Sequence, residues 1–423
     1  MSKTAIRLNV EKQTLANGST LLYKHLPGAP RLAVSIFLPG GNQLDTVPGL
    51  SDIVDRLVPK GTKTRNKEQI SIAIDGLSLE VDTDTKRDYS TMVATLLDED
   101  LDASFELMAD LFYNALLSET EFLREKEKIS GEVFMDLDAP RNRASDLFVR
   151  TIFGNTPYAT VSSVLLENLP KLTDVNTIRA HYHNAYRTER AVVTVVGDAP
   201  LSRISKKLEE YFPASKPNGN IQVVPGVAAL KDLRIAKNQM VSFARDDSSQ
   251  AHIFKGWLVP DAKHPDYAAM AVLNTILGAA GLSSRLFVEL RDKQGLAYNV
   301  RSSYETFQHK GMFYLYIGTE PSNKEKCLKG FITECQKLID TAVGEKELAD
   351  AKRNILGKRA VFLETASQQA NYIGANYLMG RTLEEVEALP EQIAAVSAKD
   401  VQRVAQYLTE PAVTAVVGPS AIL

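Results

Sequence analysis

Apolar and polar positions alternate along the chain with two different periods, which predict a mixture of strands and helices. Residues 13–25 hold apolar segments on both sides of Asn17-Gly18, a dipeptide suited to the left-handed dihedrals of a tight hairpin turn. Residues 31–38 continue as a strand, and residues 190–198 read as a buried strand followed by a turn. We therefore expect the chain to open on strands.

Helical spacing follows the first strands. A short amphipathic helix is predicted over residues 48–59, where the apolar positions are Leu50, Ile53, Val54, Leu57 and Val58. Residues 101–117 indicate a second helix. Ser118 and Glu121 form a capping box that opens a third helix, which is expected to run to about Leu137.

Two stretches of the first half recur later in the chain at one fixed offset. Residues 35–39 correspond to residues 256–260, and residues 193–197 correspond to residues 414–418, each 221 residues apart. Similarity between two β-rich strings arises easily by chance, but a shared offset without gaps indicates an internal duplication. The sequence therefore predicts two copies of one structural unit.

The boundary between the two units is predicted in residues 213–227, which have the Pro, Gly and Asn content of a linker. We place the first domain at residues 1–215 and the second at residues 228–423. A chain of 423 residues is also too long for one ordinary hydrophobic core. The expected fold class is α+β, with two homologous domains that each pack helices on a mostly antiparallel sheet.

Composition and charge exclude several classes of protein. Hydrophobic residues make up 44% and charged residues 24% of the chain, so we expect it to fold throughout. A net charge of −3, without a basic cluster, disfavours nucleic acid as a partner. No stretch of 18 apolar residues occurs, and the first residues lack a signal pattern, so we expect no membrane contact and a cytoplasmic protein. A transit sequence removed before residue 1 would leave no trace in this chain.

The two cysteines, Cys327 and Cys335, are eight positions apart in one predicted amphipathic helix. They share a face of that helix but lie too far apart along its axis to form a disulfide. We expect two reduced core thiols.

Residues 49–62 read Gly-Leu-Ser-Asp-Ile-Val-Asp-Arg-Leu-Val-Pro-Lys-Gly-Thr. This segment resembles the helix of insulinase-type and mitochondrial-processing-type zinc peptidases, whose pattern is Gly-Leu-x-His-x-x-Glu-His followed by Lys-Gly-Thr. The resemblance extends over nearly the whole chain. Its further elements are the pair Glu125 and Glu132, the strand end Val196-Gly197-Asp198, the segment 283–287, and the pair Arg291 and Tyr298.

The chain departs from this family where the metal chemistry should be. The resemblance implies two zinc-binding histidines and a water-activating glutamate on the helix, but these positions are Asp52, Asp55 and Arg56. Only the distant ligand is retained, as Glu132, and none of the six histidines forms a pair with helical zinc spacing. Because zinc prefers imidazole and thiolate donors and a guanidinium has no free lone pair, we expect no metal and no cofactor on this chain.

Two interpretations of the remaining charges stay open. Asp52, Asp55 and Glu132 could form an oxygen-only site for calcium or magnesium. The alternative is an ionic remnant, in which Arg56 pairs with Glu132 and with Asp52.

Arg291 and Tyr298 are the second candidate site. Residues 284–295 read as a helix opened by a Ser cap and closed by Gly, with Arg291 in its last turn and Tyr298 at the start of the next strand. Residue types alone favour a surface arginine and a half-buried strand tyrosine. The resemblance instead implies a substrate-contacting pair in the second domain, which faces the zinc of the first domain across a closed chamber.

The resemblance therefore implies the non-catalytic, Arg/Tyr-bearing subunit of a heterodimeric zinc metallopeptidase. Its partner would be a homologous subunit that bears His-x-x-Glu-His and holds the zinc, and its substrate would be a peptide. The chain is expected to be inactive alone. Two alternatives remain: a structural homologue without peptidase activity, like the core subunits of respiratory complexes, and a stand-alone peptide-binding protein.

Overall fold

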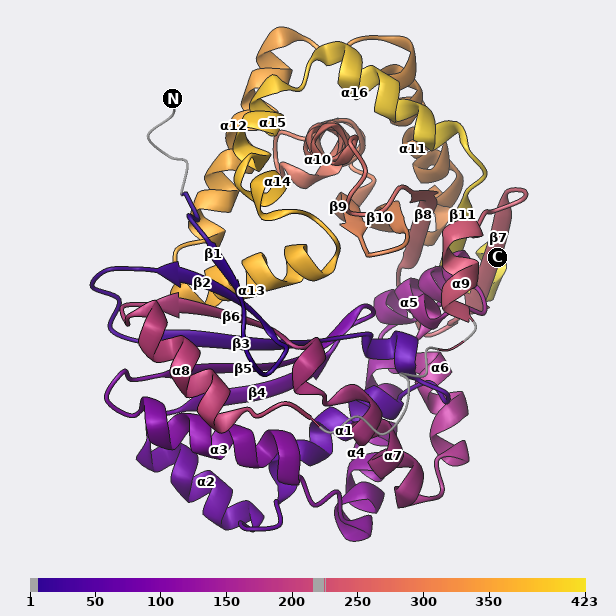
Figure 1. Ribbon diagram of the computed structural model, residues 1–423. Coiled ribbons are helices and arrows are strands. Elements are labelled where there is room, and N and C mark those ends of the chain that lie inside the picture. Colours follow the sequence, from indigo (N-terminus) through magenta and orange to yellow (C-terminus); the bar gives the residue numbers. More distant parts are fainter. Residues whose placement is uncertain (1–6, 216–223, 225) are drawn as a thin grey trace.

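The computed structural model describes residues 7–215, 224 and 226–423, and it contains two mixed sheets with helices around them (Figure 1). The first sheet has six strands in the order β1-β2-β6-β3-β5-β4. All neighbours are antiparallel except β2 and β6. The strands are β1 (Glu11–Thr14), β2 (Thr20–His25), β3 (Leu32–Pro39), β4 (Glu80–Thr85), β5 (Tyr89–Leu96) and β6 (Val192–Gly197).

The second sheet repeats this topology with five strands in the order β7-β11-β8-β10-β9. Its one parallel pair, β7 with β11, corresponds to the parallel pair β2 with β6. β6 begins at Val192 and β11 at Val413, which are 413 − 192 = 221 residues apart. The predicted duplication is confirmed by this shared strand order. The strands are β7 (Gln239–Ala244), β8 (Ala251–Val259), β9 (Ala297–Thr306), β10 (Gly311–Thr319) and β11 (Val413–Gly418).

Helices pack on both faces of each sheet. Those of the first half are α1 (Leu50–Leu57), α2 (Lys67–Gly76), α3 (Leu101–Asn114), α4 (Glu119–Asp138), α5 (Pro140–Phe153), α6 (Ser162–Asn168), α7 (Val175–Ala185) and α8 (Leu201–Tyr211). Those of the second half are α9 (Gly226–Asp232), α10 (Tyr267–Asn274), α11 (Lys324–Asp340), α12 (Glu345–Phe362), α13 (Ala366–Leu378), α14 (Leu383–Glu387), α15 (Leu389–Ala395) and α16 (Ala398–Val404). The predicted α+β class with two homologous units is confirmed.

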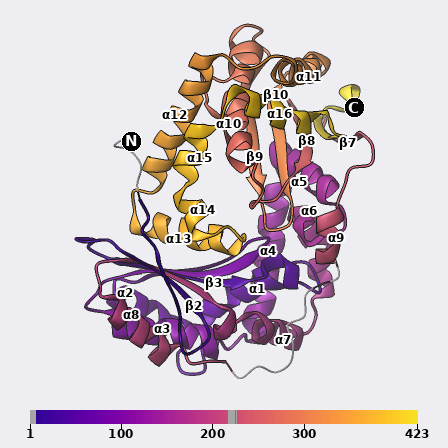
Figure 2. The same ribbon diagram turned by 45° about the horizontal axis from the view of Figure 1, so that its top comes forward.

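The two halves exchange one helix each, as Figures 1 and 2 show. α5 of the first half packs on β8 and β11, where Phe148 stacks on Phe254 with ring centroids 5.8 Å apart. α13 of the second half packs on β3 and β6 of the first sheet. A Cβ atom at Gly374 in α13 would lie 2.1 Å from the ring of Phe37, so this crossing requires glycine. Each hydrophobic core is therefore completed by the other half of the chain.

Several features predicted from local sequence signals are present in the structure. Gly18 has the positive φ, 87°, that the hairpin between β1 and β2 requires. Ser118 caps α4 by accepting the N–H of Glu121, but the predicted capping box is incomplete, because the Glu121 carboxylate accepts from Arg124 instead. Cys327 and Cys335 are buried and free in α11. Residues 216–223 and 225 of the predicted linker lie outside the described residues.

The predicted helix over residues 284–295 needs correction. The segment Phe287–Asp292 is π-helical, and the hydroxyl of Ser284 donates to the carbonyl of Gly281 instead of capping a helix. Gly295 has φ 62°, so it ends the helix as expected. Within the described residues no helix is long and apolar enough to cross a membrane.

Candidate functional site

The N-terminal end of α1, which carries the degenerate motif, is held by a buried carboxylate. Asp45 accepts the backbone N–H groups of Gly49 at 3.1 Å and Ser51 at 2.9 Å, and also the Ser51 hydroxyl at 2.6 Å. His181 from α7 lies 2.8 Å from that hydroxyl. Burial raises the pKa of Asp45 to about 7 and lowers that of His181 to about 4. This anchor was not predicted from the sequence, although an Asp shortly before a helix start is a recognisable capping signal.

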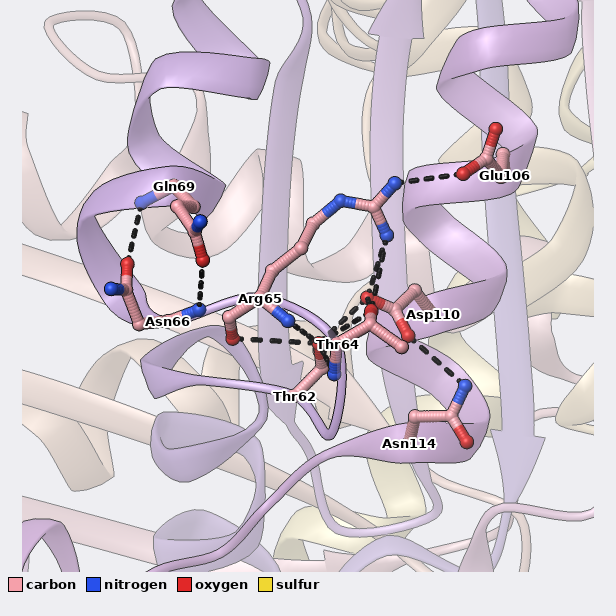
Figure 3. A network of polar contacts seen from close by, with 8 residues as sticks. All are labelled: Thr62, Thr64, Arg65, Asn66, Gln69, Glu106, Asp110 and Asn114. Atoms are coloured by element: carbon pink, nitrogen blue, oxygen red, sulfur yellow. Dashed lines mark hydrogen bonds and ion pairs between the residues drawn. The ribbon is translucent and has the colours of Figure 1, made fainter.

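The segment that follows α1 is tied to α3 by the network in Figure 3. The hydroxyls of Thr62 and Thr64 each donate to Asp110 at 2.7 Å, and Arg65 donates to the same carboxylate at 2.8 Å. Asn114 donates to the second oxygen of Asp110 at 3.0 Å. The segment that begins with Lys-Gly-Thr is therefore held against α3 by the single carboxylate of Asp110.

Arg56 lies between two carboxylates where the motif would place a histidine. Its guanidinium is 3.4 Å from Asp52, one turn earlier in α1, and 2.8 Å from Glu132 in α4. Lys128 lies 3.7 Å from the other oxygen of Glu132. Burial by itself would lower the pKa of Arg56, but the charges of Asp52 and Glu132 raise it above its ordinary value. The ionic interpretation, in which Arg56 pairs with Glu132 and Asp52, is confirmed.

This arrangement does not fit a zinc ion or an oxygen-only metal site. The guanidinium of Arg56 bridges the carboxylates of Asp52 and Glu132, and it carries positive charge without a free lone pair. Asp55 points elsewhere, toward Tyr186 and Thr85. In the described part of the chain, no three His, Cys, Asp or Glu side chains gather as a set of metal ligands. The calcium or magnesium interpretation therefore lacks the convergent carboxylates that it requires.

Asp55, which aligns with the glutamate of the resembled motif, is a buried residue with two hydroxyl partners. Its carboxylate accepts the hydroxyl of Tyr186 at 2.7 Å and that of Thr85, and the residue is 2% exposed. Burial raises the pKa of Asp55 to about 7, although both hydroxyl donors oppose this change. Glu125, the other acidic residue of the motif, is also buried and lies 3.0 Å from Lys60.

This raised pKa predicts a specific pH dependence of stability. Because an unfolded aspartate titrates near pH ~4, the folded state alone holds the Asp55 proton between about pH 4 and pH 7. The free energy of unfolding should therefore fall as pH rises through that window. Asp55→Asn keeps an amide beside Tyr186 and Thr85 but cannot titrate. Relative to the wild type, the variant should gain about 1–3 kcal/mol between pH 5 and pH 8.

Urea unfolding of both proteins at the two pH values measures this difference. Other groups with shifted pKa, such as Asp45, are common to both proteins, so their contribution cancels in the comparison. Equal pH dependence of the two proteins would contradict the raised pKa of Asp55.

Arg291 and Tyr298, the second candidate site, lie in contact with each other. The Cζ atom of Arg291 is 4.9 Å from the ring centroid of Tyr298 and 4.5 Å from that of Phe287. Tyr298 is at the start of β9, as predicted, but it is 82% exposed rather than half-buried. Among the described residues, no carboxylate pairs with Arg291 and no group hydrogen-bonds the Tyr298 phenol. The side-chain N–H groups of Arg291 and the phenol O–H of Tyr298 therefore have no hydrogen-bond partner among the described residues.

Comparison with known families matches both halves of the chain to models of one peptidase family. Residues 20–162 match the family model described as insulinase (peptidase family M16), and residues 174–355 match the model described as peptidase M16 inactive domain. The chain belongs to peptidase family M16. The resemblance to insulinase-type peptidases is therefore confirmed, whereas the mitochondrial-processing branch and the role of Arg291 and Tyr298 remain predictions.

Relatives of this M16 chain match it along nearly their full length. An uncharacterized zinc protease of Bacillus subtilis, YmxG, is 25% identical over 97% of this chain and 98% of its own. One from Streptomyces coelicolor is 28% identical over 94% of this chain and 86% of its own. The crystal structure of a protease from Helicobacter pylori is 21% identical and superposes with a TM-score of 0.87, covering 98% of this chain and 100% of the other. A peptidase M16 inactive domain from Pseudomonas fluorescens is 22% identical, with a TM-score of 0.86 over 98% of this chain and 99% of its own.

Proposed function

We propose that this M16 chain is the substrate-contacting subunit of a heterodimeric zinc metallopeptidase. The observation that carries the proposal is the contrast between its two sites: Arg56 neutralises the former metal position, while Arg291 and Tyr298 keep their polar groups free. The partner is a homologous subunit that bears His-x-x-Glu-His and supplies the zinc. The substrate is a peptide.

The chemistry of Arg291 and Tyr298 suits a peptide carbonyl. A guanidinium offers five N–H donors in a planar fork, and a phenol offers one O–H donor. The stacking of Arg291 between the rings of Phe287 and Tyr298 restricts the orientation of this fork. Donors held in place before substrate binds can stabilise the negative charge that develops on a carbonyl oxygen during hydrolysis.

Relatives named as zinc proteases support peptide hydrolysis as the reaction of the assembled enzyme. The altered motif supports a division of labour between chains. Asp52, Asp55 and Arg56 replace all three helix residues of the motif, and Arg56 is engaged with Glu132. In this proposal the chain binds and orients peptide, and the partner performs the zinc-dependent step.

The purified chain alone is expected to contain no stoichiometric zinc and to hydrolyse no peptide, because its motif residues are committed to ion pairs and a buried hydrogen-bond network. Metal analysis after dialysis without chelator, together with hydrolysis of a fluorogenic peptide library, measures both properties. Adding a His-x-x-Glu-His homologue encoded in the same genome should produce activity. About one zinc per isolated chain, removed by a chelator together with activity, would disprove the proposal.

Mass spectrometry of proteins that co-purify with the chain from its native source separates the remaining alternatives. Recovery of an M16 homologue that bears the intact motif supports the heterodimer. Recovery of a large membrane assembly would instead show a structural role. Recovery of the chain with peptides but without an M16 partner would show a stand-alone peptide-binding protein.

A further inference from the structure

Strand β7 leaves one edge of the second sheet open. In the strand order β7-β11-β8-β10-β9, β7 pairs only with β11. Gln239 donates its N–H to the carbonyl of Ala412 at 2.9 Å, and Arg245 donates to that of Gly418 at 2.8 Å. Backbone groups alternate along a strand. The N–H and C=O groups of Met240, Ser242 and Ala244 therefore point away from β11, within the plane of the sheet. These residues form a free hydrogen-bonding edge.

The duplication shows what such an edge can accept. In the first sheet β2 is the counterpart of β7, because each lies parallel to the last strand of its half. The outer edge of β2 is covered by β1, which pairs with it antiparallel. Among the described residues of the second half, no strand takes this position on β7. The second sheet therefore has one strand fewer than the first, and the missing strand is the one that would lie beside β7.

β7 also lacks the charges that protect the other sheet edges. Exposed edge strands usually carry charged residues or proline, which discourage pairing with another chain. β1, β4 and β9, the other edge strands, all contain charged residues, whereas β7 reads Gln-Met-Val-Ser-Phe-Ala. Met240 is 61% exposed and Phe243 is 40% exposed. An uncharged and partly apolar edge is suited to binding rather than to repelling a strand.

We propose that β7 is a docking strand, to which an extended, uncharged peptide segment of another polypeptide adds antiparallel as a sixth strand. The antiparallel direction follows from the pairing of β1 with β2. A second copy of this chain fits less well. The six residues of β7 span only about 20 Å, which is too short a contact for the ~800 Å² that each partner of a stable dimer usually buries.

The docking strand is separate from the pair Arg291 and Tyr298. Tyr298 lies on β9, at the opposite edge of the same sheet, four strand spacings or roughly 19 Å from β7. Figure 1 shows β7 on the outer side of the second half, beside α5. A peptide on β7 would therefore be tethered without occupying the candidate substrate-contact site.

Peptide binding to the wild-type chain gives the first test. The probe is a blocked peptide, Ser-Thr-Val-Ser-Tyr-Thr-Val-Ser, and its control has the same side chains but an N-methyl group on every amide, so that neither edge of the control can donate. The unmodified peptide should bind, and the control should bind at least ~10-fold more weakly, because N-methylation removes the donors of a strand pair. Hydrogen exchange should slow at the amides of Met240, Ser242 and Ala244 when the unmodified peptide is bound.

A matched pair of variants gives the second test. Ser242→Pro removes an outward N–H without removing a bond to β11, since proline is tolerated at exposed edges, whereas Ser242→Thr keeps that N–H. Proline should weaken peptide binding at least ~10-fold, and threonine should leave it unchanged. Equal binding of the two peptides by the wild type overturns the proposal even if the proline variant fails to fold. A dimer of the free chain that Ser242→Pro dissociates would show that a second copy occupies this edge.

Discussion

Arg291→Ala is expected to lower the turnover of the assembled heterodimer by about 100-fold, the typical cost of losing one preorganised donor to a developing oxyanion. Tyr298→Phe should also lower turnover, because it removes a phenol donor but keeps the ring on which Arg291 stacks. Neither variant should prevent assembly, since Tyr298 is 82% exposed and no carboxylate among the described residues pairs with Arg291. Steady-state kinetics of purified heterodimers measures the effect.

Lys293→Ala is the matched control for Arg291→Ala. It removes a positive charge two residues away, from a side chain that is paired with Glu289 and faces solvent. We expect its turnover to match that of the wild type. The stacking lost with Arg291 is worth only about 0.5–1 kcal/mol at an exposed site, so a large drop in stability would indicate misfolding instead. Unchanged kinetics in both the Arg291 and Tyr298 variants would show that the pair does not contact substrate.

A variant that combines Asp52→His, Asp55→Glu and Arg56→His is expected to bind one zinc ion per chain. Positions 52 and 56 share one face of α1, and both contribute to the ion-pair cluster that includes Glu132. Replacing Arg56 removes the positive charge and releases Glu132 as a ligand. Zinc affinity is expected to be modest, because the variant does not restore the groups that orient ligand imidazoles. Such groups can raise metal affinity by ~10-fold to 100-fold.

The buried position of Asp55 refines this experiment. Asp55 faces Tyr186 and Thr85 rather than the cluster, so a double variant with Asp55 unchanged should bind zinc as well as the triple variant. Zinc titration of both variants, each with and without Glu132→Ala, measures this. If the folded variants bind no zinc, or bind it equally well without Glu132, then these residues do not surround one former metal site.

Much of the fold could be predicted because it depends on local patterns. The hairpin at Gly18, the cap at Ser118 and the buried strand β6 each follow from neighbouring residues. The duplication was visible because both copies kept an offset of 221 residues. The exchange of α5 and α13 could not be predicted, because a helix's apolar face does not specify which of two similar sheets will cover it.

Some features of the candidate site could likewise be predicted from nearby residues, and others depend on contacts between distant segments. The loss of the zinc donors follows from residue chemistry alone, since Asp52, Asp55 and Arg56 have replaced the histidines and the glutamate of the motif. The ion pair of Arg56 with Glu132 was predicted because the helix period and the motif spacing set both positions. The inward orientation of Asp55 was not, because its partner Tyr186 is 131 residues away in the chain.

Residues close together in the chain are enough to indicate an internal duplication and a motif without zinc donors, because periodicity and donor chemistry are local properties. The burial of Asp55, the exposure of Tyr298 beside Arg291 and the free edge of β7 could not be read from the chain and became visible in the folded structure. These features depend on contacts between distant segments, whose geometry is set by packing of the whole fold.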